Sequence, residues 1–329
     1  MKIVLSLIPS EMLAFICGAL IFGCATPLPN KTVPPPGPYV KTMDLRAGGF
    51  RRMYRLHIPA GYKGEVSRPL VVVIHGAFST AKEIEKQSGF SKLADHEGFI
   101  AVYPEGMGIF GFLQHWNAGH CCGKAAADNI DDVGFIAAVI DDVAARLSVD
   151  LDRIYMVGFS NGGMLTYRFA AERSSVVAAV APMAASIGGR ASADIPLWVL
   201  PKPAAKVPVI VFHGLDDDSV PYLGGQSLRH GGEREYLSVE DSVHFWVQHN
   251  GCRKQAVQKN LYDGRVAYSL WKDPAGSNDV SLYAIKEWGH IWPGKYFTGA
   301  LEPENPLNGF DAAEIIWDFF KRYRRSSQF

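Results

Sequence analysis

Short apolar runs alternate with helix-like segments along most of this chain, and this alternation constrains its fold more than any other feature. Residues 69–74 and 207–212 are continuous apolar runs rich in β-branched side chains, a pattern typical of strands buried on both faces. Residues 131–147 instead carry apolar side chains at helical spacing. This alternation predicts an α/β fold with a mostly parallel central sheet and helices on both of its faces.

The same two patterns locate the individual elements. We expect strands at residues 43–46, 50–58, 69–74, 99–103, 153–157, 176–181, 207–212 and 281–285. We expect helices at residues 90–97, 131–147, 162–172, 239–250 and 311–323. Residues 25–38 contain six prolines and predict an extended linker. No strong boundary or repeat interrupts the chain after it, so we predict one folded domain over residues 39–329.

Composition places the chain among globular proteins. Hydrophobic residues make up 48% of its 329 residues and charged residues 20%, which excludes a disordered or fibrous protein. Lysine plus arginine and aspartate plus glutamate both number 33, so no positive excess can neutralise a nucleic-acid backbone. We therefore expect no nucleic-acid partner.

Residues 1–24 resemble an export signal. Lys2 is followed by an apolar, uncharged stretch at residues 12–23, whose length suits a signal better than a stable membrane span. Small residues around Cys24 favour ordinary cleavage there, whereas residues 21–24 also resemble a bacterial lipobox, which predicts a lipid anchor on Cys24. Both routes predict a secreted or extracytoplasmic protein. A retained helix is the third interpretation.

The cysteines fit such an oxidising compartment. Cys121, Cys122 and Cys252 remain once Cys17 and Cys24 are assigned to the signal. One disulfide can form and one thiol is left over. A bridge from Cys252 to either of the other two is one interpretation, and three separate buried thiols are the other. The chain has no Cys-x-x-Cys pair, so we expect neither a zinc centre nor a thioredoxin-like redox site.

The pentapeptide at residues 158–162 reads Gly-x-Ser-x-Gly and lies between a predicted strand and a predicted helix. A serine on such a sharp turn needs small neighbours, and Gly158 and Gly162 supply them. The N-terminus of the following helix stabilises negative charge that develops nearby. Ser160 is therefore our candidate nucleophile. The alternative is a serine that only caps the helix.

A nucleophilic serine needs a base, and the base needs a carboxylate that orients it. Catalytic groups collect at the carboxyl ends of parallel strands. The strand at 207–212 is followed by three aspartates, residues 216–218, one of which we expect to be the acid. The strand at 281–285 is followed by His290 in a short loop, and we expect His290 to be the base. Three histidines compete with it, namely His230, His244 and His249.

Such a site also needs backbone N–H groups that stabilise an oxyanion. We expect one from Asn161, the residue after the candidate nucleophile, and one from Ala77, which follows the strand at 69–74. Gly76 allows a substrate to come close to this backbone. We interpret His75 as a structural histidine hydrogen-bonded within the turn, because its position does not suit a base.

Many short motifs occur here in one order and together resemble a family of secreted esterases that includes polyhydroxybutyrate depolymerases, feruloyl esterases and acetylxylan esterases. They stand at residues 54–62, 73–76, 116–117, 121–123, 131–135, 158–163, 213–214, 220–222, 224–225, 250–252, 289–290 and 292–294. The resemblance covers roughly residues 39–323 and implies an α/β-hydrolase fold with a Ser-Asp-His triad. The family pattern places the acid three residues after the glycine of a His-Gly pair and three residues before a Val-Pro pair. These pairs stand here at residues 213–214 and 220–221, so the resemblance implies that Asp217 is the acid. Residues 198–206 and Trp288 depart from the family pattern and are expected to shape the pocket.

The resemblance implies hydrolysis of carboxylic esters through an acyl-enzyme, without a cofactor or a metal. The expected substrates are feruloyl or acetyl esters of plant polysaccharide, or short hydroxyalkanoate esters. Trp116, Trp288 and Trp292 are candidates for stacking on an aromatic acid or a sugar, with core packing as the alternative. Three other activities stay open: depolymerisation of a solid polyester, peptide hydrolysis on the same fold, and non-catalytic binding in the cell envelope.

Overall fold

The computed structural model describes residues 35–44, 51–109, 112–229 and 233–325. The predicted export signal, most of the predicted linker and the candidate lipid anchor Cys24 lie outside these residues and stay predictions. Within the described ranges, no helix is long and apolar enough to cross a membrane.

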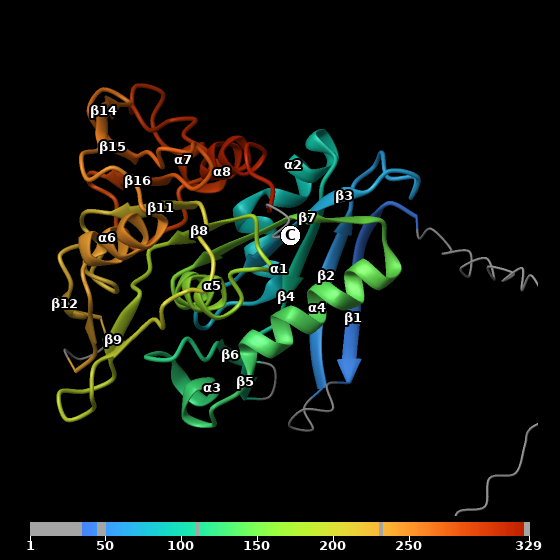
Figure 1. Cartoon of the computed structure of the whole chain (residues 1–329), viewed down its shortest axis with the longest axis horizontal. Helices are drawn as coiled ribbons and strands as arrows, with labels where there is room; N and C mark the ends of the chain where they lie inside the picture. The colour runs from blue at the N-terminus through green and yellow to red at the C-terminus, as the bar shows by residue number, and fades with distance from the viewer. Residues whose placement is uncertain (1–34, 45–50, 110–111, 230–232, 326–329) are drawn as a thin grey trace, which may run out of the picture. The chain divides into compact units, whose positions relative to one another are not determined.

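A ten-stranded sheet organises the fold (Figure 1). In spatial order its strands are β1 (Gly37–Asp44), β2 (Arg51–Ile58), β4 (Ile100–Pro104), β3 (Arg68–Ile74), β7 (Val149–Phe159), β8 (Ala179–Met183), β11 (Val209–Gly214), β16 (Val280–Ile285), β15 (Val266–Trp271) and β14 (Val257–Leu261). The neighbours β4, β3, β7, β8, β11 and β16 run parallel to one another. Antiparallel strands flank them on both sides, β2 and β1 beside β4 and β15 and β14 beside β16. The predicted mostly parallel sheet is confirmed. The carboxyl ends of β3, β7, β11 and β16 therefore meet at one edge.

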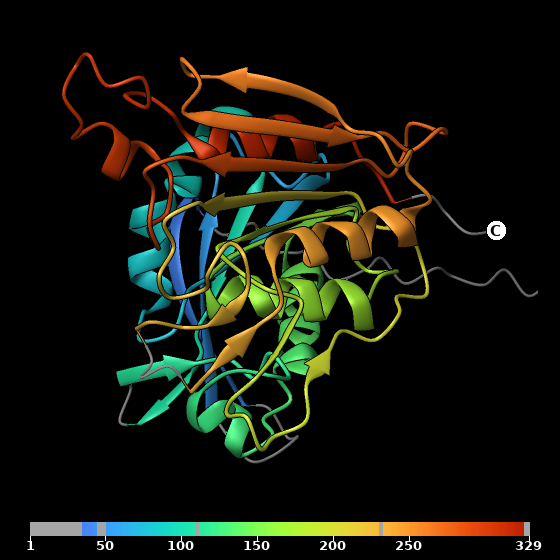
Figure 2. The ribbon, with the colours of Figure 1, turned by 90° about the vertical axis from the view of Figure 1, so that its left-hand side faces the viewer.

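Helices cover both faces of this sheet, as predicted (Figure 2). The helices of the described residues are α1 (Ala81–Ser88), α2 (Phe90–Glu97), α3 (Gly123–Ala127), α4 (Asp132–Arg146), α5 (Asn161–Glu172), α6 (Val239–Asn250), α7 (Lys295–Thr298) and α8 (Ala312–Phe320), of which α3 packs on β5 and β6 rather than on this sheet. Leu70, Val72 and Ile74 of β3 share a hydrophobic cluster with α4, α5 and α6. Val71 and Val73 share the opposite cluster with α1, α2 and α8. Each fully buried aliphatic side chain of this kind contributes roughly 1.5–3 kcal/mol.

Two smaller antiparallel sheets accompany the large one. Strands β5 (Met107–Ile109) and β6 (Phe112–His115) form the first. The second, which we name the small sheet, has the order β10 (Trp198–Val199), β9 (Gly188–Arg190), β13 (Glu235–Tyr236) and β12 (Gly225–Gln226). These strands are not predicted from the sequence, because two to four residues are too few to show an alternating pattern.

Apart from the short helices α3 and α7, which are not predicted from the sequence, the main elements lie within a few residues of their predicted positions, with three differences. The first strand begins at Gly37 rather than residue 43 and overlaps the end of the predicted linker. Helix α1 is not predicted, because half of its side chains are charged and the apolar stripe is narrow. The hairpin of β14 and β15 is not predicted either, since the side chains of β14 are almost all exposed and show no alternation.

Candidate active site

Ser160 occupies a sharp turn between β7 and α5. Its backbone has φ 56° and ψ −124°, a conformation that non-glycine residues rarely adopt. A Cβ at Gly158 would collide with the backbone of Gly162, and a Cβ at Gly162 would collide with the carbonyl of His75. Close backbone packing therefore requires both glycines. The Ser160 side chain makes no capping hydrogen bond to α5, which argues against a purely capping serine.

Three of the predicted site residues form one chain of hydrogen bonds. Ser160 Oγ lies 2.7 Å from His290 Nε2, and His290 Nδ1 lies 2.7 Å from Asp217 Oδ2. The three residues follow β7, β16 and β11, whose carboxyl ends meet at the same edge of the sheet. This arrangement is the one that activation of a serine hydroxyl by a neighbouring base requires.

Asp217 is buried and held as a carboxylate. Its Oδ1 accepts hydrogen bonds from the N–H groups of Ser219 at 2.9 Å and Val220 at 2.8 Å. Its Oδ2 lies 3.4 Å from Nε2 of His213, in addition to the contact with His290. Burial alone would raise the pKa of Asp217, but the hydrogen bonds from the two histidines outweigh it, so this pKa lies below its ordinary value. The ionised carboxylate accepts the Nδ1 proton of His290, which leaves Nε2 as the proton acceptor facing the serine.

The neighbouring aspartates point elsewhere. Asp216 is exposed, and Asp218 forms an ion pair with Arg229 at 2.9 Å. Of the three aspartates in this loop, Asp217 is the one that contacts His290. The spacing taken from the family resemblance and the geometry therefore agree on the same carboxylate.

The other histidines of this region have different positions. His244 and His249 lie in α6, and His230 lies outside the described residues. His75 is buried, with Nδ1 2.7 Å from the carbonyl of the next residue and Nε2 accepting the Gly106 N–H at 3.0 Å. Burial lowers the pKa of His75 to about 4. Because both ring nitrogens are satisfied in the neutral form, the predicted structural role of His75 is confirmed.

The two predicted oxyanion donors border the serine. Ala77 and Asn161 line the same cavity as Ser160. The Ala77 N–H has no hydrogen-bond acceptor among the described residues, and the Asn161 N–H belongs to the first turn of α5, which lacks intrahelical partners. Asn161 is fixed by the backbone of Trp116, which donates to its Oδ1 at 2.7 Å and accepts from its Nδ2 at 3.0 Å. Both N–H groups are thus free to meet a developing negative charge.

A cavity of about 250 Å³ opens beside the serine. Besides the serine and the two N–H donors, its wall includes Phe78, His115, Met164, Val220, Arg234 and Tyr236. Arg234 and His115 are not predicted from the sequence. The only signal for Arg234 is a run of charges at residues 233–235 after two glycines, and such a run is equally typical of a solvated loop.

The three tryptophans predicted to contact substrate are buried away from this cavity. Trp116 is 0% exposed and donates from Nε1 to the His75 carbonyl at 2.9 Å. Trp288 and Trp292 belong to the hydrophobic cluster of α1, α2 and α8. Because none of them lines the cavity, the geometry does not support the predicted stacking and agrees with core packing instead. Residues 198–206, expected at the pocket mouth, do not line it either.

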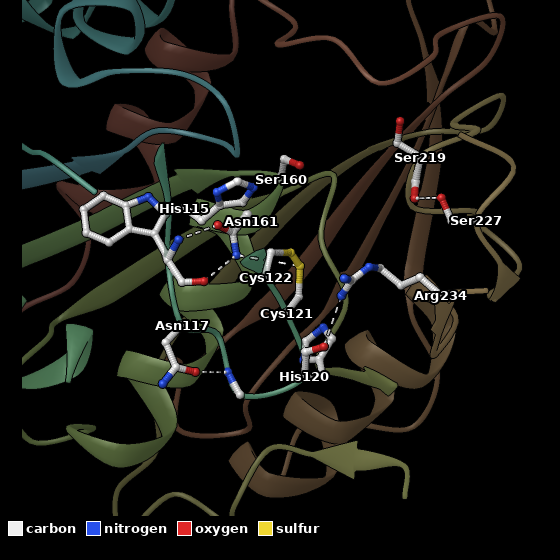
Figure 3. The surroundings of a disulfide bond; sticks show 12 residues. His115, Asn117, His120, Cys121, Cys122, Ser160, Asn161, Ser219, Ser227 and Arg234 are labelled. Carbon is white, nitrogen blue, oxygen red and sulfur yellow. Dashed lines mark hydrogen bonds between the residues drawn. A yellow bond between two sulfur atoms is a disulfide. The ribbon is translucent and has the colours of Figure 1, made fainter. Parts of the chain in front are cut away.

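Cys121 and Cys122 form a disulfide beside the cavity (Figure 3). Cys122 lines the cavity wall. Cys252 follows α6 and is a free, half-buried thiol that donates to the Asn278 carbonyl at 3.3 Å. The predicted bridge to Cys252 is wrong, because the two adjacent cysteines pair with each other. Three separate thiols are excluded for the same reason.

Relatives of this chain are named as esterases and depolymerases. It is 30% identical over 240 residues to feruloyl esterase B from Piromyces equi, covering 70% of this chain and 41% of that protein. It is 24% identical over 277 residues to poly(3-hydroxyalkanoate) depolymerase C from Paucimonas lemoignei, covering 77% of this chain and 61% of that protein. The chain therefore spans less than two thirds of the length of either relative.

This chain also resembles a solved esterase structure and matches a family model. Acetyl xylan esterase from Aspergillus awamori superposes with a TM-score of 0.53 at 14% sequence identity, covering 77% of this chain and 94% of that chain. The predicted α/β-hydrolase fold is confirmed by this likeness and by the sheet order. The family model described as esterase PHB depolymerase matches residues 52–236, more than half of the chain. The chain therefore belongs to the esterase PHB depolymerase family.

Proposed function

We propose that this protein hydrolyses carboxylic esters with Ser160 as the nucleophile. The observation that carries the proposal is the hydrogen-bond chain from Ser160 through His290 to Asp217, which starts in the wall of a cavity. Membership of the esterase family supports the same reaction. An intact chain of these three groups also disfavours a non-catalytic binding protein.

The first half of the reaction forms an acyl-enzyme. His290 Nε2 takes the proton of Ser160 Oγ while the oxygen bonds to the ester carbonyl carbon. The carbonyl oxygen becomes an oxyanion, which the N–H groups of Ala77 and Asn161 stabilise. Removing one such donor typically raises the barrier by about 2.7–4 kcal/mol. The carbon–oxygen bond to the alcohol then breaks, and the alcohol leaves with the proton held by His290.

The second half returns the enzyme to its starting state. His290 takes a proton from water as the water oxygen bonds to the acyl carbon. The bond to Ser160 Oγ then breaks, the serine oxygen recovers the proton, and the acid is released. Asp217 keeps the imidazole in one orientation and stabilises its charged form in both halves. This sequence of steps uses the side chains and backbone of the chain together with one water molecule.

The cavity supports a short substrate. A volume of about 250 Å³ is at or below the lower end for small-molecule sites. A short hydroxyalkanoate ester or an acetyl ester fits this size better than a polymer chain. The buried tryptophans remove the argument for stacking a feruloyl ring, so feruloyl esters rank lower. Solid polyester and peptides remain alternative substrates.

A substrate panel tests the proposal. Purified protein and its Ser160→Ala variant are assayed with short p-nitrophenyl esters, acetylated xylan, methyl ferulate, hydroxybutyrate oligomers and a peptide amide. We expect hydrolysis of the short esters by the parent protein and its loss in Ser160→Ala. Amide hydrolysis without ester hydrolysis would favour the peptidase alternative, and hydrolysis that persists in Ser160→Ala would refute the nucleophile.

We also propose export of the protein, either by signal cleavage near Cys24 or with Cys24 as a lipid anchor. The support is the sequence of residues 1–24 alone. Cell fractionation of the parent and of Cys24→Ala tests this part. A parent in the membrane fraction and a variant released from it would support the anchor, whereas a parent that stays in the cytoplasm would refute export.

A further inference from the structure

Arg234 brings a positive charge into the cavity wall that ester hydrolysis itself does not use. It lines the cavity together with Ser160 and Asn161. Its carbonyl accepts the Ser227 N–H at 2.8 Å, and the next residue begins β13, so the small sheet fixes its backbone. Figure 3 shows the guanidinium reaching from this sheet toward the disulfide and His120.

The guanidinium has no counter-charge among the residues that the structure describes. Its one side-chain hydrogen bond runs from Nη1 to the His120 carbonyl at 3.3 Å. Arg190, on the neighbouring strand of the small sheet, differs because it is paired with Glu235 at 2.5 Å. A guanidinium carries five N–H donors. Most of those on Arg234 therefore lack a protein acceptor, although the side chain is half-buried.

The rest of the cavity wall supplies no ion-pair partner for this charge among the described residues. Arg234 is the only lysine or arginine among the described wall residues. Burial lowers the pKa of His115, and the charge of Arg234 lowers it further, so His115 adds a neutral ring. Glu233 also lines the cavity, but it is exposed and forms no ion pair with Arg234 in the described part of the chain.

We propose that Arg234 binds a carboxylate of the substrate, so that the preferred esters carry an ionised acid group besides the ester that is cleaved. A planar guanidinium presents paired N–H donors that match the two oxygens of a carboxylate. In a cavity of about 250 Å³, the acid must lie only a few bonds from the ester. Half-esters of short dicarboxylic acids and short hydroxy-acid oligomers with a free acid end share this chemistry. The inference rests on the proposed esterase function.

Binding to the Ser160→Ala protein tests the proposal without turnover. The ligand is monomethyl glutarate, its neutral counterpart is methyl butyrate, and affinity is measured by calorimetry at neutral pH. We expect monomethyl glutarate to bind more tightly than methyl butyrate. Adding Arg234→Gln to the Ser160→Ala protein should weaken the binding of monomethyl glutarate about ten- to hundredfold. The matched control is Arg229→Gln, which removes the same charge from an exposed ion pair outside the cavity and should leave both affinities unchanged.

Turnover of the same two esters gives a second measurement, by titration of the released acid. We expect Arg234→Gln to lower kcat/KM for monomethyl glutarate at least tenfold more than for methyl butyrate, mainly through KM, and Arg234→Lys to recover part of the loss. Equal losses for both esters, or anion binding that Arg234→Gln does not change, would overturn the carboxylate site. Failure of the esterase proposal is distinct, since neither ester would then be hydrolysed while calorimetry would still report on Arg234.

Discussion

The two sides of the cavity are built in different ways. Ser160, Asp217 and His290 follow long strands of a parallel sheet that is buried on both faces. Arg234 precedes a two-residue strand of the small sheet. The first side rests on strands whose ends are fixed by many neighbours, whereas the second rests on a few hydrogen bonds near the surface.

This difference assigns separate tasks to the two sides. Bond-making chemistry needs atoms held to within a fraction of an ångström, and buried parallel strands provide that rigidity. Choice of substrate needs only a suitably placed charge or surface, and short loops supply it without disturbing the sheet. We therefore expect changes on the sheet side to abolish turnover and changes on the small-sheet side to alter selectivity.

The largest expected effect separates two adjacent aspartates. Asp217→Asn removes the charge that orients and stabilises the His290 imidazole, and kcat should fall about 10⁴-fold, as in other triads. Asp218→Asn is the matched control, because Asp218 pairs with Arg229 instead, and its kcat should change about twofold at most. Steady-state kinetics on a short p-nitrophenyl ester decides, and equal effects of the two variants would contradict the assignment.

A pH dependence of stability should follow from His75, which supports the sheet side of the cavity. Burial lowers its pKa in the folded protein to about 4 from an ordinary 6.5. A lowered folded-state pKa gives stability that is present above pH 6.5 and lost as the pH falls toward 4. The loss from this one group is about 3 kcal/mol. Urea unfolding at pH 7.5 and pH 4.5 measures the unfolding free energy at each pH. Its loss between the two pH values should be smaller in His75→Gln than in the parent, and an equal loss in both proteins would rule this explanation out.

A glycine pair tests the packing behind the nucleophile. Gly158→Ala places a Cβ against the backbone of Gly162, and overpacking of this kind typically costs about 1–3 kcal/mol of unfolding free energy. Gly61→Ala is the matched control, because a Cβ there meets nothing within 4 Å. Chemical denaturation measures both. A Gly158→Ala protein as stable as the parent would show that the turn has more room than this packing implies.

The smallest effect is expected on the small sheet. Arg190→Gln breaks the ion pair with Glu235. The Arg190 side chain is 30% exposed and the Glu235 side chain 36%. Exposed pairs contribute about 0.2–1 kcal/mol, so unfolding free energy should fall by less than 1 kcal/mol, and turnover of a neutral ester should stay at the parent level. A loss of turnover comparable to that of Asp217→Asn would abolish the proposed division between the two sides.

The same division explains how much the sequence predicts. The parallel sheet, its helices and the residues that follow β7, β11 and β16 are predictable, because long apolar runs and a strained glycine turn leave clear patterns. Arg234 and the small sheet are not, since two-residue strands and loop charges carry no periodicity. The pairing of Cys121 with Cys122 is missed, because the expectations were a bridge to the distant Cys252 or three separate thiols. Stacking by Trp116, Trp288 and Trp292 cannot be distinguished from core packing in the sequence, because an aromatic side chain is equally typical of a pocket and of a core.

The measurement that tests the central claim most directly is labelling of the protein with a fluorophosphonate, followed by peptide mass spectrometry and a parallel ester assay. We expect one adduct, on the peptide that contains Ser160, with esterase activity falling in proportion to its formation. The Ser160→Ala protein should take up no label and hydrolyse no ester. Label on another residue, or ester hydrolysis that survives complete labelling of Ser160, would contradict the account.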